Sequence, residues 1–95
     1  PMASADDLDR WSSALRRVAA SLDRLGDERA VHARRARVDW SGHTRTRFDA
    51  ERARRDAEIA ALAAQCRRLA VDYARLADEV RAASGRSVPA VRRAG

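Results

Sequence analysis

Apolar residues recur along the first third of the chain at alternating intervals of three and four residues. They are Leu8, Trp11, Leu15, Val18, Leu22 and Leu25. This heptad spacing places them in one stripe along a helix. Ser4, followed three residues later by Asp7, provides an N-terminal cap for that helix. We therefore predict a helix over residues 5–38, preceded by an N-terminal remnant and cap at 1–4.

A second stripe with the same spacing occupies the other half of the chain. Its members are Ile59, Leu62, Cys66, Leu69, Tyr73 and Leu76. This stripe predicts a second helix over residues 44–83, with a Trp-x-Gly turn over 40–42 between the two helices. Ser84 and Gly85 are expected to end the second helix, which leaves a flexible basic tail over 84–95.

The two stripes match each other when the chain folds back at Gly42. Opposing residues then have numbers that sum to 84, so that Trp11 faces Tyr73 and Leu15 faces Leu69. Because six apolar pairs share this register, we expect the two stripes to form the seam, the line along which the two helices touch. The predicted fold is all-α, an antiparallel two-helix hairpin.

A hairpin of 95 residues encloses no large core, so we expect it to dimerise into a four-helix bundle. Small residues beside each predicted seam allow a second hairpin to approach closely. They are Ala5, Ser12, Ala19, Gly26, Ala63, Ala70 and Ala77. Two partners stay open: a second copy of the chain, antiparallel so that its acidic open end lies beside the basic tip, or a related acidic hairpin.

The positive charge is concentrated at the predicted tip of the hairpin. Residues 29–55 carry nine arginines and three acidic residues, a balance equal to the net +6 of the whole chain. The seam register brings Arg29, His32, Arg52 and Arg55 together. The favoured interpretation is that a small helix rotation pairs alanines there and leaves the arginines in water. The alternative is that these four residues form a site for an acidic partner or an anion. Nucleic acid is the less favoured ligand, because acidic residues interrupt the arginines and no recognition motif accompanies them.

No pattern of residues indicates catalysis, a metal or a cofactor. The two histidines, His32 and His43, have no partners at metal-ligand spacing. The single cysteine, Cys66, lies on an apolar stripe and is interpreted as a packed thiol. We expect a non-catalytic protein that binds no cofactor and does not insert into membranes, since no run of 18 apolar residues occurs.

The sequence resembles one family of small helical hairpins. Trp40 and Gly42 form a Trp-x-Gly turn between two long helices, in a chain close to 100 residues, and Phe48 follows on the second helix. This combination resembles the WXG100 (Esx-like) family. The resemblance implies a function in protein–protein packing, synthesis in the cytoplasm, and export without a signal peptide by a type VII secretion system, whose ATPase is then a further partner. No signal-peptide pattern precedes the first predicted helix.

The chain departs from the export motif of that family, a tyrosine followed four residues later by an acidic residue. Tyr73 is the only tyrosine, and Ala77 stands at the fourth position after it. Three outcomes stay open: export with the help of a partner, export as a variant, and no export.

Overall fold

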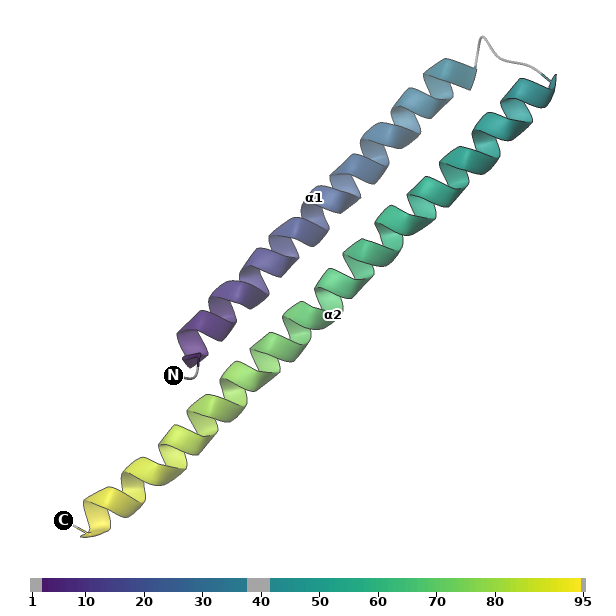
Figure 1. Ribbon diagram of the computed structural model, residues 1–95. Coiled ribbons are helices and arrows are strands. Elements are labelled where there is room, and N and C mark those ends of the chain that lie inside the picture. The colour runs from purple at the N-terminus through teal and green to yellow at the C-terminus, as the bar shows by residue number, and fades with distance from the viewer. Residues whose placement is uncertain (1–2, 38–41, 95) are drawn as a thin grey trace.

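Two long helices make up almost the whole chain. The computed structural model describes the backbone of residues 3–37 and 42–94 and the side chains of residues 3–36 and 42–85. Helix α1 spans Ala5–Arg37 and helix α2 spans Gly42–Ala94. They lie antiparallel and side by side in a rod with extents of 80 × 18 × 16 Å (Figure 1). The all-α helical hairpin predicted from the sequence is confirmed.

Helix α1 begins with a reciprocal cap formed by Ser4 and Asp7. The backbone N–H of Ser4 donates to Asp7 Oδ2 over 3.2 Å, and the backbone N–H of Asp7 donates to Ser4 Oγ over 3.1 Å. These bonds pair two N–H groups that the helix itself leaves without partners. The cap predicted at Ser4 is therefore present.

Helix α2 begins at Gly42, which has a φ of +65°. This left-handed conformation is open to glycine because it has no Cβ to clash with the neighbouring carbonyl. Gly42 is thus the residue of the predicted turn that the structure describes. Trp40 and Ser41 lie outside the described residues.

Helix α2 continues well beyond the start of α1. Arg81 contacts Asp6 and Asp9 in the first turns of α1, so residues 82–94 of α2 extend past it, over about 20 Å. Figure 1 shows this overhang at the C-terminal end. It corrects the predicted helix end at Ala83 and the separate tail over 84–95. Ser84 and Gly85 each lower helix propensity by only about 1 kcal/mol or less, which is too little to stop a long helix.

The seam between α1 and α2 is built mainly from small residues. The buried side chains of the described part are Leu8, Ser12, Ala19, Ala33, Ala63, Cys66, Ala70 and Ala77. Ala19, Ala63 and Cys66 form its central cluster, with Leu15 and Leu22 packed against them. Ser12 Oγ donates a 2.7 Å hydrogen bond to the backbone carbonyl of Ala70, so the one buried polar side chain in this set has a partner. Small side chains at heptad spacing let two helices approach closely.

The two helices pair in the predicted register, but each helix is rotated about its own axis relative to the prediction. Trp11 and Tyr73 meet edge to face, with ring centroids 6.0 Å apart and planes inclined by 69°. However, half of the large residues expected in the seam are exposed beside it: Trp11, Val18, Leu25, Leu62, Leu69 and Leu76. This corrects the prediction that the two stripes of large residues fill the seam. The helices rotate so that alanine and serine face each other, and the bulkier side chains spread along one flank.

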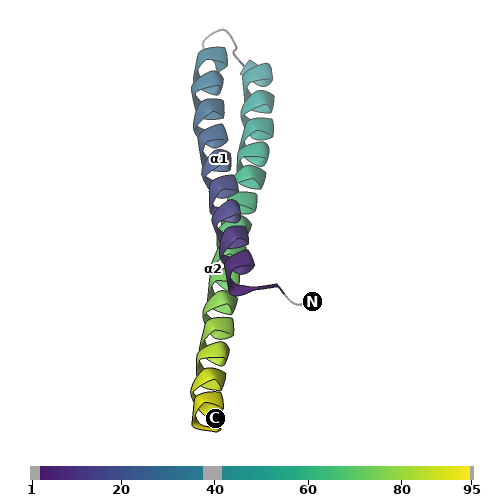
Figure 2. The same ribbon diagram turned by 90° about the vertical axis from the view of Figure 1, so that its left-hand side faces the viewer.

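The two helices cross at an angle. Figure 2 shows the N-terminal end of α1 passing in front of α2, whereas the helices lie side by side near the turn.

Among the described residues, neither helix contains an apolar stretch of the length needed to span a membrane.

Candidate protein-protein interface

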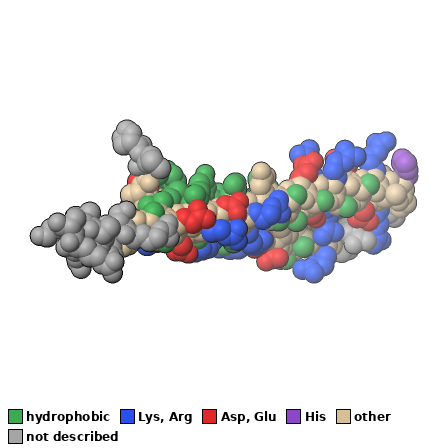
Figure 3. Space-filling view, turned by 90° about the horizontal axis from the view of Figure 1, so that it is seen from below, with side chains coloured by type: hydrophobic (Ala, Val, Ile, Leu, Met, Phe, Trp, Pro, Cys, Tyr) green, Lys and Arg blue, Asp and Glu red, His purple; other side chains and the backbone are tan. Residues whose placement is uncertain are grey.

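One flank of the hairpin carries an exposed row of large apolar side chains from both helices. Between 40% and 49% of the surface of each is exposed, and they are Trp11, Val18, Leu25, Leu62, Leu69 and Leu76. Within each helix they recur every seven residues, so each set forms a line parallel to the seam. We call this surface the apolar face. In the space-filling view, hydrophobic side chains gather towards the open end of the rod (Figure 3).

The opposite flank of the seam is polar, and ion pairs between the two helices run along it. Arg67 pairs with Asp23, and Arg81 pairs with both Asp9 and Asp6 across the helices. The hydrogen bond to Asp9 raises the pKa of the Arg81 guanidinium above its ordinary value. The two flanks therefore differ in kind: the apolar one exposes a row of six large hydrophobic side chains, whereas the opposite one exposes Val71 among its ion pairs.

The four basic-tip residues predicted to come together do so. Arg29, His32, Arg52 and Arg55 line one open groove of about 500 Å³ between the helices near the turn. The same groove is lined by Ala33, Ala36, Phe48 and Glu51. We call it the tip groove. It is wide because the seam positions of α1 here are alanines, which leave space that longer side chains only partly fill.

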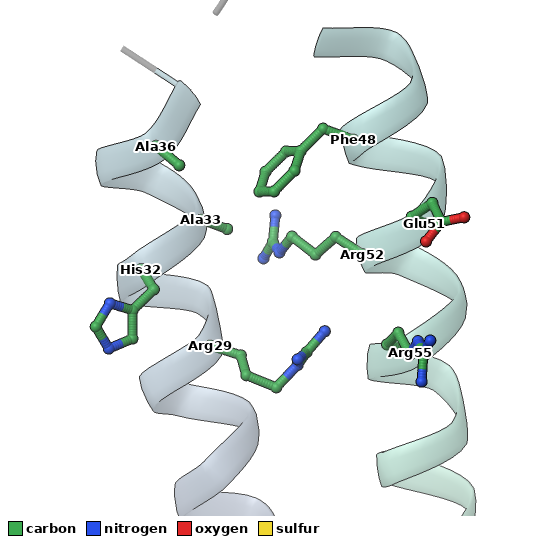
Figure 4. A pocket seen from close by; sticks show the side chains of 8 residues that line it. All are labelled: Arg29, His32, Ala33, Ala36, Phe48, Glu51, Arg52 and Arg55. Atoms are coloured by element: carbon green, nitrogen blue, oxygen red, sulfur yellow. The ribbon is translucent and has the colours of Figure 1, made fainter. Parts of the chain in front are cut away.

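Two arginines of the tip groove share one carboxylate. Arg29 Nε lies 2.9 Å from Asp56 Oδ1, and Arg52 Nε lies 3.2 Å from Asp56 Oδ2. Figure 4 shows Arg29, Arg52 and Phe48 reaching into the space between α1 and α2. All three charged side chains of this network are about two-thirds buried, with 28% to 35% of their surface exposed. The network therefore holds two partly buried cations for one anion.

The favoured interpretation, in which the tip alanines pair with each other, is wrong. It placed Ala30 opposite Ala53 and Ala33 opposite Ala50, with the arginines in water. Instead Ala50 and Ala53 are exposed, and only Ala33 is buried. The sequence reasoning missed Asp56, although it lies seven residues before the buried Ala63 and so occupies a seam position. That spacing, together with Arg29 opposite it, was the available signal.

The cysteine and the second histidine considered in the sequence lie outside both the apolar face and the tip groove. Cys66 is a buried free thiol within the central alanine cluster, as expected for a packed cysteine. His43 is exposed at the start of α2. Among the described residues, no group of three or more histidine, cysteine or acidic side chains is placed to hold a metal ion.

Comparison with known protein families, with curated proteins and with solved structures finds no match for this chain.

Proposed function

We propose that this chain works by packing its apolar face against a second helical hairpin, as a non-catalytic member of a four-helix bundle. The observation that carries the proposal is the exposure of six large apolar side chains in two parallel lines on one flank. A contiguous apolar surface of this kind on a small protein is typical of an interaction site.

The total exposed area supports the same proposal. The chain exposes 7359 Å², whereas a compact monomer of its 10.5 kDa mass exposes about 5400 Å². A standard protein–protein interface buries about 800 Å² on each partner. The rod thus has ample surface for such an interface, and its apolar face supplies the hydrophobic centre.

The proposed biological setting is that of a WXG100-like substrate or partner of a type VII secretion system. It rests on the hairpin fold, on the Trp-x-Gly sequence at the turn and on the left-handed Gly42. Export is tested by comparing culture supernatants of the source strain with those of a strain lacking the secretion ATPase. The proposal predicts the protein in the first supernatant only, and equal amounts in both would contradict it.

The packing proposal is tested with a pair of matched variants, Leu69→Asp and Val71→Asp. Both side chains are exposed, at 40% and 51%, but Leu69 lies on the apolar face and Val71 on the other side of α2. Protein recovered from the source cells is sized by chromatography with light scattering. We expect wild type and Val71→Asp at about twice the 10.5 kDa chain mass and Leu69→Asp as a monomer. If both variants keep the wild-type mass, the interface lies elsewhere.

A further inference from the structure

The tip groove is a continuation of the apolar face. On α1, His32 follows Trp11, Val18 and Leu25 at the same interval of seven residues. On α2, Phe48 and Arg55 precede Leu62, Leu69 and Leu76 in the same way. Residues at this spacing lie on one side of a helix. A partner helix that lies along the apolar face therefore ends over the tip groove.

Surface chemistry changes from apolar to cationic along that path. Arg29 and Arg52 share the single carboxylate of Asp56, and Arg55 adds a further cation at the groove. Among the described residues that line it, Glu51 is the one acidic side chain. Phe48 and Ala36 keep an apolar wall beside these charges. The groove thus suits a helix segment that brings carboxylates next to an apolar side chain.

A second copy of the chain does not bring an excess of acidic side chains to this place in either orientation. In a parallel pair, each tip groove faces the other tip, where residues 29–55 carry net +6. In an antiparallel pair with the apolar faces overlaid, the groove faces α2 from about Val80 onward. After Glu79 the sequence contains four arginines and no acidic residue.

The acidic open end offsets this only in part. Asp6 and Asp9 both pair with Arg81 of their own chain, and Asp7 pairs with Arg10. These internal ion pairs weaken the attraction of the open end for the tip of a second copy, and so they weaken the charge argument for an antiparallel homodimer.

We propose that the tip groove selects a different chain as partner, one whose helix carries acidic side chains where it passes over Arg29, Arg52 and Arg55. This inference rests on the proposed packing function and adds the chemistry of the partner. Apolar contact supplies most of the affinity, and the groove rejects partners that are neutral or basic at this end.

The test uses two synthetic amphipathic helices of four heptads, about 42 Å long. Both carry leucine along one side; one has four glutamates in its terminal heptad, and its twin has four glutamines. Binding of each to the full chain is measured by calorimetry at about 150 mM salt. We expect the glutamate peptide to bind on the order of tenfold more tightly than its twin.

The site is assigned with Arg55→Gln and the matched control Arg54→Gln. Both remove one positive charge from neighbouring positions of α2, but Arg54 does not line the groove. Arg55 is also outside the Arg29–Asp56–Arg52 network, so its loss should leave the fold intact, as circular dichroism will show. Arg55→Gln should reduce the preference for glutamate severalfold, and Arg54→Gln should retain it.

The other outcomes overturn the inference in distinguishable ways. Equal binding of the two peptides to wild type would leave the packing function in place but remove the acidic selectivity. If Arg55→Gln and Arg54→Gln lose the preference for the glutamate peptide equally, the attraction is an unspecific effect of charge. Tighter Arg55-dependent binding of random-sequence duplex DNA would assign the groove to nucleic acid. If neither peptide binds, the packing function and this inference both fail.

Discussion

At the scale of single residues, side-chain size decides which positions lie between the helices. Ala19, Ala63 and Ala70 each have 1% of their surface exposed, whereas their neighbours Val18, Leu62 and Leu69 are 40% to 49% exposed. Each pair is adjacent in sequence, so its two members lie about 100° apart around the helix axis and compete for the same seam position. Close helix approach favours the small members of each pair, and the large ones stay exposed beside the seam.

Enlarging a seam alanine should destabilise the hairpin. Ala19→Leu places a large side chain at a position with 1% exposure, and such overpacking typically costs about 1–3 kcal/mol. The neighbouring Ala20 is exposed, so Ala20→Leu serves as the control and should change stability by less than about 0.5 kcal/mol. Urea denaturation followed by circular dichroism measures both. Equal effects of the two changes would mean that the large residues, not the alanines, form the seam.

Two glycines should respond to alanine with opposite signs. Gly42 has a φ of +65°, so Gly42→Ala should destabilise by about 1–2 kcal/mol. A Cβ at Gly26 would meet no atom within 4 Å, and this glycine lies inside α1, so Gly26→Ala should stabilise by about 0.5–1 kcal/mol. Thermal melting of the two variants tests the pair. A stabilising Gly42→Ala would show that the turn does not need the left-handed conformation.

At the scale of helices, the sequence predicts the register but not the rotation. The register follows from matched heptads on either side of Gly42, and the contact between Trp11 and Tyr73 bears it out. The rotation of each helix about its axis does not follow from the sequence, because a stripe of large residues and an adjacent stripe of small residues have the same heptad period. Hydrophobicity favours the large stripe as the seam, but in a two-helix rod that stripe can also be reserved for a partner.

At the tip and at the C-terminal end, too, the sequence predicts one part of the structure and not another. Arg29, His32, Arg52 and Arg55 could be grouped from the register alone, and they line one groove. Asp56, which joins two of them, does not follow from the pattern of apolar residues, because it is a charged residue at a seam position. The sequence also does not predict the continuation of α2 to Ala94, because a Ser-Gly pair is typical of a helix end although neither residue abolishes helix formation.

The overhang of α2 should be dispensable for the stability of the hairpin. Arg81 is the residue of α2 that reaches the first turns of α1, so a chain ending at Gly85 keeps every described contact between the helices. We expect its unfolding free energy to match that of the full chain within about 0.5 kcal/mol, with a lower total helix signal. A larger loss on urea denaturation would mean that residues 86–95 pack onto the hairpin.

At the scale of the whole molecule, the hairpin is thin and its charge is divided into zones. The rod measures only 18 × 16 Å across, so few side chains can be enclosed between two helices. Its tip carries net +6, and the chain beyond Glu79 carries four more arginines without an acidic residue. The apolar face therefore runs from a basic tip to an acidic open end, and the arginines beyond Glu79 belong mostly to the overhang of α2. A rod of this design gains stability from any partner that binds the folded state.

The most direct test of the central claim, that the apolar face is covered by another helical chain, is site-specific photo-cross-linking in the source cells. A benzoyl-phenylalanine replaces either Leu69, on the apolar face, or Val71, which is also exposed but lies on the other side of α2. Cross-linked products are identified by mass spectrometry. The account predicts that position 69 yields one dominant adduct with a small helical chain and that position 71 yields none. Equal labelling at both positions, or no adduct at 69, would contradict it.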